Sequence, residues 1–330
     1  MSVVGAKLAD SFQSKNLDEL MKSGLYGQTD FRMLTPWQTP YRYRQVNTPG
    51  LFYSEGFFGG YVEQIGRAPR GYRTFALLAE DSPRVVYYGG HISQTDLIVI
   101  PNSQYFNTVS PPGFHGYMFT LPEHFLADIA DKMFGVNWLE IGEKIDAGYF
   151  YTLTDESLKS LRDLLQQLSV QSDILACLAL GMDTTEPAEI SSIRITLGQE
   201  VIKALLTSNE NTNRPLPPCR DRSLRMALDF IERQTPEFLS TRDLAEVIGA
   251  SVRTLEYAFQ QHFSMSPKKY LRARQLNFVM RDLRKKSYKE ASVTDISNHW
   301  GLTHPGQFAK DYRALFGELP SQTLRKDAST

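Results

Sequence analysis

The stretch FLSTRDLAEVIGASVRTLEYAFQQHF, residues 238–263, has the pattern of two short helices joined by a tight turn. Ser240 is placed to cap the first helix, with Asp243 three residues later as its partner in a weak reciprocal capping box. Gly249 supplies the left-handed residue that ends this helix, and Ser251 caps the next one. The sequence therefore predicts a helix-turn-helix unit, in which the second helix enters a DNA major groove.

Helical spacing separates an inner from an outer face in the second helix of this unit. Leu255 and Phe259 recur four residues apart and are expected to pack against the first helix. The outward face then carries Arg253, Thr254, Glu256 and Tyr257.

A second unit follows about fifty residues later in ASVTDISNHWGLTHPGQFAKDYRALFGELP, residues 291–320. Gly301 is expected to make the turn, Thr303 to cap the second helix, and Pro305 to lie in its first turn, where a missing N–H costs nothing. The apolar residues expected to face inward are Val293 and Ile296 on the first helix, and Phe308, Tyr312, Leu315 and Phe316 on the second. The outward face of the second helix carries His304, Gly306, Gln307, Lys310 and Arg313.

Between the units, Ser266 and Pro267 begin a longer helix with the sequence KKYLRARQLNFVMRDLRKK. Its apolar positions, with many Lys and Arg between them, predict a rigid strut between the two units. Two reading helices that enter successive major grooves on one face of DNA must lie about 34 Å apart, or the DNA must bend.

These residues resemble the C-terminal domain of the AraC/XylS family of bacterial transcription regulators over residues 224–325. The shared motifs are LAxxxGxSxRxL from Leu244, SPxxYL from Ser266, and VTDI from Val293 through FGxxP, which ends at Pro320. The resemblance implies DNA base contacts from Arg253, Glu256 and Tyr257 in the first unit and from Gly306, Gln307 and Lys310 in the second. Contacts with the DNA backbone are expected from Thr254, Lys268, Lys269, His304 and Arg313.

This sequence departs from the family pattern at Tyr257, at Trp300 and Leu302 beside the turn, and at Gly306. These departures affect the expected DNA sequence preference rather than the expected fold.

Composition and charge divide the chain into two domains. Residues 220–330 contain 19 Lys and Arg against 13 Asp and Glu, a charge of +6, and the other residues contain 17 against 24, a charge of −7. A basic domain beside an acidic one is expected when only one of them meets phosphates. Residues 207–219 are polar and rich in proline and are expected to form a linker between a sensor and dimerisation domain, 1–206, and a DNA-binding domain, 220–330.

The residue pattern of the first domain predicts a β-rich region at about residues 41–121 and a helical region at about 122–206. The spacing of the strands favours an antiparallel barrel or sandwich. Residues 56–139 also resemble, more loosely, the cupin-like sensor domains found in many AraC/XylS regulators. The predicted fold is therefore α+β: a cupin-like β-barrel with accessory helices, followed by an all-α domain with two helix-turn-helix units joined by a strut helix.

The helical region has leucine stripes, at residues 158–168 and 201–206, that must bury one face. The domain's own sheet is the first expected partner of these faces, and a homodimer seam is the alternative.

A metal-dependent cupin enzyme is the competing interpretation. The β-rich region contains His91 and His115, and His124 follows it, without an HxH pair or an HxxxE spacing that would suit zinc or iron. Cys177 and Cys219 are too few and too scattered for the metal-bound cysteine cluster of an alkyl-transfer protein. We therefore expect neither an enzyme nor a metal or other cofactor.

The effector is least evident from the sequence. Arg67, Arg70 and Arg73 surround the turn RAPRGYR and predict an anionic effector, such as a nucleotide second messenger. Solvated turn charges are the plainer alternative. The expected partners are double-stranded promoter DNA, a small-molecule effector, a second copy of the chain and RNA polymerase, with no membrane. We expect a cytoplasmic transcription activator.

Overall fold

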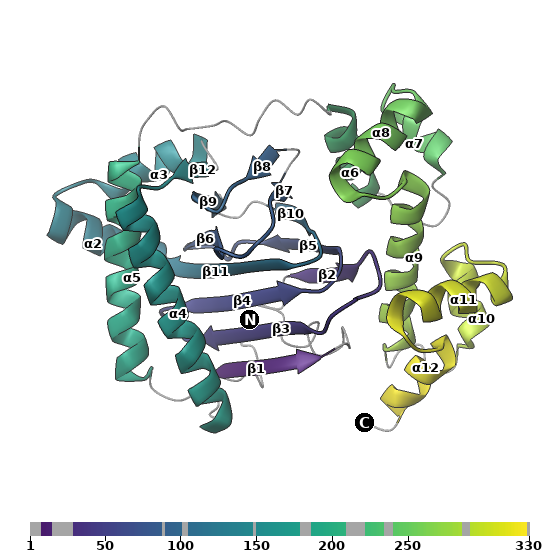
Figure 1. Cartoon of the computed structure of the whole chain (residues 1–330), viewed down its shortest axis with the longest axis horizontal. Coiled ribbons are helices and arrows are strands. Elements are labelled where there is room, and N and C mark those ends of the chain that lie inside the picture. Colours follow the sequence, from purple (N-terminus) through teal and green to yellow (C-terminus); the bar gives the residue numbers. More distant parts are fainter. Residues whose placement is uncertain are drawn as a thin grey trace.

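The computed structural model describes residues 8–14, 29–87, 90–100, 105–147, 150–178, 186–208, 222–233, 240–285 and 291–328. Figure 1 shows a β-rich part with two long helices along one side and a group of shorter helices on the other. Sheet and helix are thus separated along the chain, in agreement with the predicted α+β class.

The described strands form two antiparallel sheets. The larger sheet has the order β1 (Ala9–Ser14), β3 (Tyr41–Asn47), β4 (Phe52–Phe58), β11 (Phe114–Pro122), β6 (Tyr72–Leu78), β9 (Asp96–Ile100) and β12 (Phe150–Thr152). The smaller sheet has the order β2 (Asp30–Met33), β5 (Val62–Arg67), β10 (Tyr105–Ser110), β7 (Val85–Tyr87) and β8 (Gly90–Ile92).

Strand periodicity gives the larger sheet two different faces. In β4, Tyr53 faces a buried core beneath the long helices, whereas Ser54 and Phe58 line a cavity on the other face. The apolar alternation detected in the sequence therefore corresponds to two buried layers rather than to a single barrel interior.

The predicted closed barrel is not found among the described residues, because each sheet keeps two edge strands. The β-structure also begins before residue 41, with β1 and β2, and β12 lies within the region predicted to be helical. Alternation along a strand shows which face is buried, but it does not show which edges pair, so it cannot distinguish a barrel from a sandwich.

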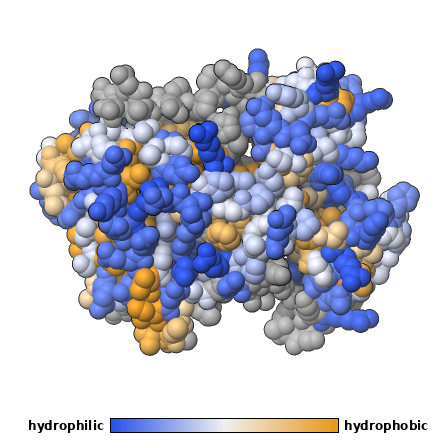
Figure 2. Space-filling model, in the orientation of Figure 1, coloured by the Kyte–Doolittle hydropathy of each residue, from blue (hydrophilic) through white to orange (hydrophobic). Residues whose placement is uncertain are grey.

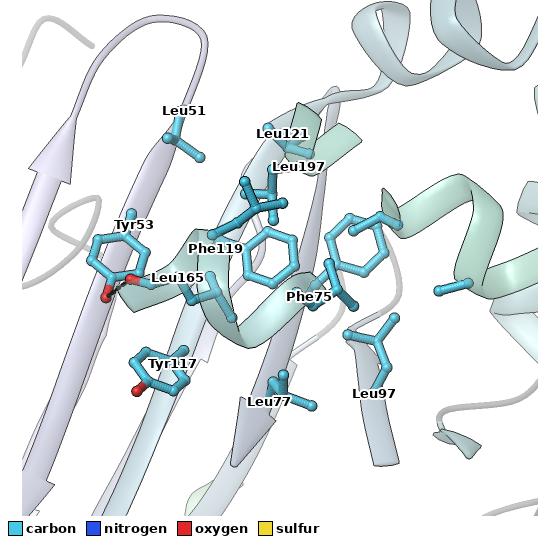
Figure 3. Close-up of a cluster of buried hydrophobic side chains, with 14 of the residues drawn as sticks. Leu51, Tyr53, Phe75, Leu77, Leu97, Tyr117, Phe119, Leu121, Leu165 and Leu197 are labelled. Carbon is cyan, nitrogen blue, oxygen red and sulfur yellow. Dashed lines mark hydrogen bonds between the residues drawn. The ribbon is translucent and has the colours of Figure 1, made fainter. Parts of the chain in front are cut away.

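Helices α4 (Asp155–Leu178) and α5 (Ala188–Thr207) cover one face of the larger sheet, with α2 (Glu123–Phe134) and α3 (Trp138–Ala147) beside them. Figure 3 shows the core between sheet and helices, where the rings of Phe75 and Phe119 stack with centroids 5.3 Å apart. The Tyr53 hydroxyl donates to the carbonyl of Leu165 at 3.0 Å, which ties the sheet to α4. The leucine stripe of α4 is buried as predicted, and in α5 only Leu206 of the predicted stripe is exposed.

The C-terminal part contains α6 (Arg222–Arg233), α7 (Thr241–Val247), α8 (Val252–Phe263), α9 (Pro267–Leu283), α10 (Val293–His299), α11 (Pro305–Phe316) and α12 (Pro320–Ala328). Helix α9 contacts α8 at one end and α10, α11 and α12 at the other, so it is the predicted strut. The predicted linker lies almost wholly outside the described residues.

The strut also packs against the smaller sheet. Asn277 on α9 accepts the backbone N–H of Met33 at 3.0 Å and donates to its carbonyl oxygen at 2.7 Å. Strand β2 lies at the edge of its sheet, and Asn277 therefore satisfies backbone groups that a neighbouring strand would otherwise pair.

Candidate DNA-binding site

Helices α7 and α8 form the first helix-turn-helix unit, with both predicted caps in place. The Asp243 N–H donates to Ser240 Oγ at 3.2 Å, and the Ser240 N–H donates to the Asp243 carboxylate at 2.9 Å. Hydrogen bonding of the Asp243 carboxylate with the side chain and the backbone of Ser240 holds the pKa of Asp243 below its usual range. Gly249 has φ +66° in the turn, and Ser251 Oγ accepts the Thr254 N–H at 3.0 Å. The local sequence thus determines where both helices begin and where the first one ends.

Helices α10 and α11 repeat this arrangement. Ser292 and Asp295 form a complete capping box, which the sequence S-V-T-D could have revealed. Gly301 has φ +73° in the turn, as predicted. The cap predicted at Thr303 is wrong, because α11 begins at Pro305 with His304 as its N-cap and without a side-chain cap bond. The fixed φ of proline suits the first helical residue, so the preceding residue takes the cap position.

The outward residues predicted on both reading helices are exposed. On α8 they are Arg253, Thr254, Glu256 and Tyr257, and on α11 they are His304, Gly306, Gln307, Lys310 and Arg313. Tyr257 is 68% exposed, so its ring is accessible on the surface of α8. A Cβ placed on Gly306 would meet open space, so this position leaves room at the surface of α11.

The strut joins the cores of both units. At its N-terminus Ser266 Oγ accepts the Lys269 N–H, and Lys268 and Lys269 are exposed beside α8. Near its C-terminus the rings of Phe278 and Trp300 stack at 4.7 Å, and Trp300 Nε1 donates to the buried Asp282 carboxylate at 2.7 Å. The unusual residue at position 300 therefore fixes α10 to the strut.

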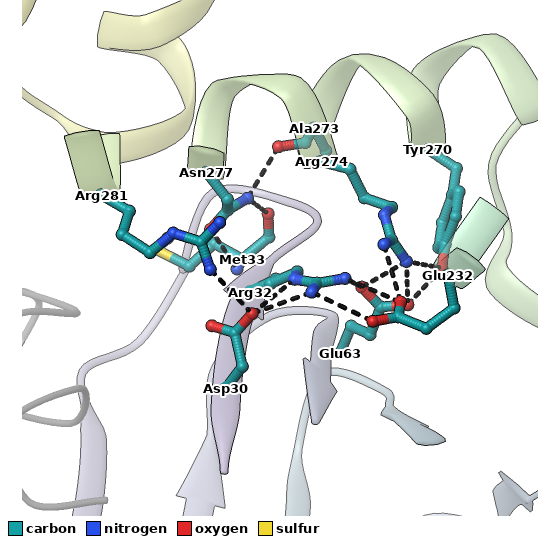
Figure 4. A network of polar contacts seen from close by, with 10 residues as sticks. All are labelled: Asp30, Arg32, Met33, Glu63, Glu232, Tyr270, Ala273, Arg274, Asn277 and Arg281. Carbon is teal, nitrogen blue, oxygen red and sulfur yellow. Dashed lines mark hydrogen bonds and ion pairs between the residues drawn. The ribbon is translucent and has the colours of Figure 1, made fainter. Parts of the chain in front are cut away.

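A buried polar cluster connects the strut to the sheet, and its members converge on one carboxylate in Figure 4. Glu63 of β5, 0% exposed, accepts from Arg274 at 3.2 Å and from the Tyr270 hydroxyl. Arg32 of β2 donates to Glu63 at 3.2 Å, and both arginines also reach Glu232 on α6. Burial of Arg274, whose side chain is only 1% exposed, opposes its charge, but Glu63, Tyr270 and Glu232 together outweigh burial and raise the pKa of Arg274. Burial raises the pKa of Tyr270, and the Glu63 charge adds to this effect.

The same two strands also form part of the wall of a cavity. In the antiparallel register Arg32 pairs with Glu63, and the neighbouring residues Phe31 and Gln64 pair with each other. Phe31 and Gln64 line a mainly apolar cavity of about 70 Å³ between the two sheets. Alternate residues of β2 and β5 therefore face the cavity and the strut. Sequence analysis missed this arrangement, because its partners are more than 200 residues apart and share no local pattern.

The three arginines proposed as an effector site do not share one exposed turn. Arg67 and Arg70 are exposed at the ends of the turn, but Arg73 is buried and donates to Glu123 at 2.8 Å. The three guanidinium groups therefore do not form one exposed cationic turn. Their role in binding an effector stays a prediction.

Comparison with protein families places one similarity in the C-terminal part, and comparison with curated sequences finds relatives over part of the chain. A family described as a helix-turn-helix domain matches residues 244–326. The XylDLEGF operon transcriptional activator of Pseudomonas putida is 36% identical over 124 residues, which are 38% of this chain and 39% of that protein. A probable thc operon regulatory protein of Rhodococcus erythropolis is 28% identical over 166 residues, 49% of this chain and 47% of the relative. The chain thus spans two-fifths to one-half of these relatives.

Two solved structures resemble the chain in different ways. The AraC-like transcriptional activator CuxR is 12% identical and covers 81% of this chain and 93% of its own, with a TM-score of 0.40. A regulator with an AraC-type DNA-binding domain from Chromobacterium violaceum is 30% identical over 32% of this chain and 92% of its own, with a TM-score of 0.29.

The relatives are named as regulators of transcription, which agrees with the prediction that the chain is not an enzyme. The matched residues contain the strut, the second helix-turn-helix unit and nearly all of the first. The C-terminal part of the chain is therefore a helix-turn-helix domain of the AraC type, similar to that of the AraC/XylS transcription regulators.

Proposed function

We propose that this protein is a sequence-specific transcription activator whose affinity for promoter DNA is controlled by a small molecule bound to the N-terminal domain. The observation that carries the proposal is the pair of capped helix-turn-helix units on one strut, with both reading faces exposed. In these faces, Arg253 can pair with guanine, Glu256 can accept from cytosine and Gln307 can pair with adenine. Tyr257, Gly306 and Lys310 complete the proposed base-reading set.

Backbone contacts are assigned to residues that surround these faces. Lys268, Lys269 and Arg313 carry charges, whereas Thr254 and His304 lie at the first turn and the N-cap of the reading helices. Phosphate contacts fix the register of a protein on DNA without reading sequence.

The test is a comparison of specific and random DNA. The full chain selects sites from a pool of random duplexes, and fluorescence anisotropy then gives Kd on the selected site and on unselected DNA. Arg253→Ala should weaken binding to the selected site by about 1 to 3 kcal/mol and leave random DNA nearly unaffected. Arg222→Ala, which removes an exposed arginine of α6 outside both units, is the matched control. Failure of the full chain to enrich any sequence at low salt would refute the proposal.

The cavity between the sheets is a better place for an effector than the arginine turn. Apolar side chains dominate its wall, and Gln64 and Ser110 form a hydrogen bond of 2.8 Å there, so a few polar groups are available to orient a ligand. An anion at Arg67, Arg70 and Arg73 is the second candidate. A thermal-shift screen with organic acids, nucleotides and neutral apolar compounds separates the two: loss of a ligand's effect in Arg67→Ala/Arg70→Ala assigns it to the turn, and loss in Gln64→Leu assigns it to the cavity.

The cavity's size supports a link between effector and DNA. A volume of about 70 Å³ holds only a few water molecules, so a larger ligand requires the strands to move apart. Because β2 and β5 also hold the strut through Arg32 and Glu63, their displacement would change the position of the DNA-binding helices.

Two further partners belong to the proposal. Val170, Ile174 and Leu178 lie four residues apart on α4 and are exposed, and Figure 2 shows a hydrophobic patch at the lower left, where the end of α4 lies. We assign this stripe to a second copy of the chain. Ile174→Glu should lower the mass found by sedimentation equilibrium from that of a dimer to that of a monomer.

An activator also contacts RNA polymerase, and both act where the chromosome lies, in the cytoplasm. The described part of the chain has no helix with the length and apolarity that crossing a membrane demands.

A further inference from the structure

A chain of polar contacts extends from the strut to one residue of the second reading helix. Arg272 Nε on α9 donates to Asp311 Oδ2 at 2.9 Å. The other carboxylate oxygen, Oδ1, accepts Gln307 Nε2 at 2.6 Å, one helical turn earlier on α11. The side chains of Arg272 and Asp311 are 29% and 27% exposed, whereas Gln307 is fully at the surface.

This contact determines which way the Gln307 amide faces. An ionised carboxylate can only accept hydrogen bonds, so the NH₂ group of the amide must be the side that faces Asp311. The opposite orientation would place two oxygens in contact without a proton between them. Gln307 Oε1 and the second N–H of Nε2 are therefore left free to bind another molecule.

The free groups match one base better than the others. Adenine presents an amino donor and the N7 acceptor in the major groove, which complement one carbonyl oxygen and one N–H. Guanine presents two acceptors at that edge, and its O6 would then face Gln307 Oε1. We propose that Asp311, held by Arg272, is a positioning residue that fixes Gln307 as a reader of adenine and causes it to reject guanine.

The charge of Asp311 supports this role. A carboxylate beside a DNA-facing helix weakens attraction to phosphates for every sequence, so it contributes nothing to general affinity. Its ion pair with Arg272 offsets that charge. The pair also ties the carboxylate to α9, the helix that contacts both units. The remaining effect of Asp311 is on the orientation of its neighbour, and therefore on specificity.

The inference rests on the proposed role of Gln307 in base reading, and the experiment separates the two. The full chain and its variants each select sequences from a pool of duplexes with a random central segment, and the bound DNA is sequenced. Gln307→Ala identifies the position that Gln307 reads, where the unaltered chain should prefer adenine by roughly 5- to 150-fold, the equivalent of about 1 to 3 kcal/mol. Asp311→Asn should remove most of this preference, because asparagine can donate as well as accept and no longer fixes the amide. Asp311→Glu, which keeps an acceptor, should restore part of it.

Glu246→Gln is the matched control, because it removes one exposed carboxylate from α7 without touching either reading face. It should change overall affinity slightly and no base preference. If Gln307→Ala removes the preference and Asp311→Asn keeps it, Gln307 is a reader but the positioning role is wrong. If Gln307→Ala changes no position, its base-reading role fails and the inference fails with it. Loss of preference at every position in Asp311→Asn, with a lower melting temperature, would show a merely structural residue and would also overturn the inference.

Discussion

His115 lies between two carboxylates at the edge of the covered sheet face. Its Nε2 is 2.8 Å from Glu55 and its Nδ1 is 2.6 Å from Asp81, and Arg44 binds the other oxygen of Glu55. Burial opposes charging of the ring, but the two carboxylates outweigh it and raise the pKa of His115. Burial alone would raise the pKa of Glu55, yet the bonds from His115 and Arg44 lower it to about 2.

These shifts predict a pH dependence of stability. A raised histidine pKa stabilises the fold below the ordinary value near 6.5, and the contribution is lost as the pH rises through the folded-state pKa. The lowered pKa of Glu55 stabilises the fold above about 4.5, and that contribution is lost as the pH falls toward 2. The urea midpoint of the full chain should therefore fall between pH 6 and 8.5 more steeply than that of His115→Gln. Parallel pH profiles for the two proteins would contradict this account.

Gly301 and Gly306 lie five residues apart, and adding a Cβ should have opposite effects on stability at the two positions. Gly301 has φ +73°, a conformation that costs a residue with a Cβ about 1 to 2 kcal/mol. Gly306 is helical with open space around it, so a methyl group there adds helix propensity. Gly301→Ala should lower the melting temperature, and Gly306→Ala should leave it unchanged or raise it. Equal losses in calorimetric melting would show that the turn tolerates a side chain.

Local features of these residues could be predicted from the sequence, whereas long-range features could not. Ser240, Ser251 and Gly301 act within one helical turn of the groups they cap or turn, so their spacing contains the information. Glu63 and Arg274 depend on a partner 211 residues away, and a charged residue in a strand otherwise predicts a solvated face. The same limit applies to the contact of Asp311 with Arg272, which lies 39 residues away.

At the scale of elements, α9 is both a spacer and a basic surface. Lys268 and Lys269 are exposed at its N-terminus, next to the first reading helix. If Lys269 meets a phosphate, Lys269→Ala should reduce the slope of log Kd against log salt by about 1 and weaken selected and random DNA alike. Lys132→Ala on α2 removes a lysine of the N-terminal domain and should leave the slope unchanged. An unaltered slope in the Lys269 variant would make it a solvated charge.

The helical elements matched their sequence predictions more closely than the strands did. Helices of the C-terminal part have caps and a stripe of period 3.6, which define both their limits and their buried faces. Strands β1 and β12 have no such signals: β1 is mostly polar, and β12 is three residues long within a helical region. Their pairing with β3 and β9 depends on residues far away in the chain.

At the scale of the whole molecule, the cluster around Glu63 links β2 and β5 to α6 and α9, and we expect the sheets and the C-terminal helices to unfold together. Removing one partner of a buried ion pair costs about 3 to 5 kcal/mol, because the remaining charges stay buried. Glu63→Gln should therefore split a single urea transition into two, with the DNA-binding part unfolding separately from the sheets. Glu232→Gln, whose side chain is 35% exposed, should shift the midpoint less and keep one transition. Circular dichroism and tryptophan fluorescence would follow the two parts, and coincident curves for Glu63→Gln would refute the coupling.

If both reading helices enter DNA grooves as proposed, the strut makes them a bivalent ligand with a short, stiff connection. Once one helix occupies its groove, the other is confined near the next groove at a high effective concentration, so two weak contacts add into one strong one. This gain depends on the rotational phase of the DNA. An insertion of about 5 base pairs between the two contacted segments turns the second to the opposite side of the helix, and about 10 base pairs returns it to the same side but further away. Affinity should fall to that of a single unit in both cases, because a fixed strut cannot lengthen. A flexible linker of the same number of residues, which can extend further than a helix, would recover much of the affinity after an insertion of about 10 base pairs.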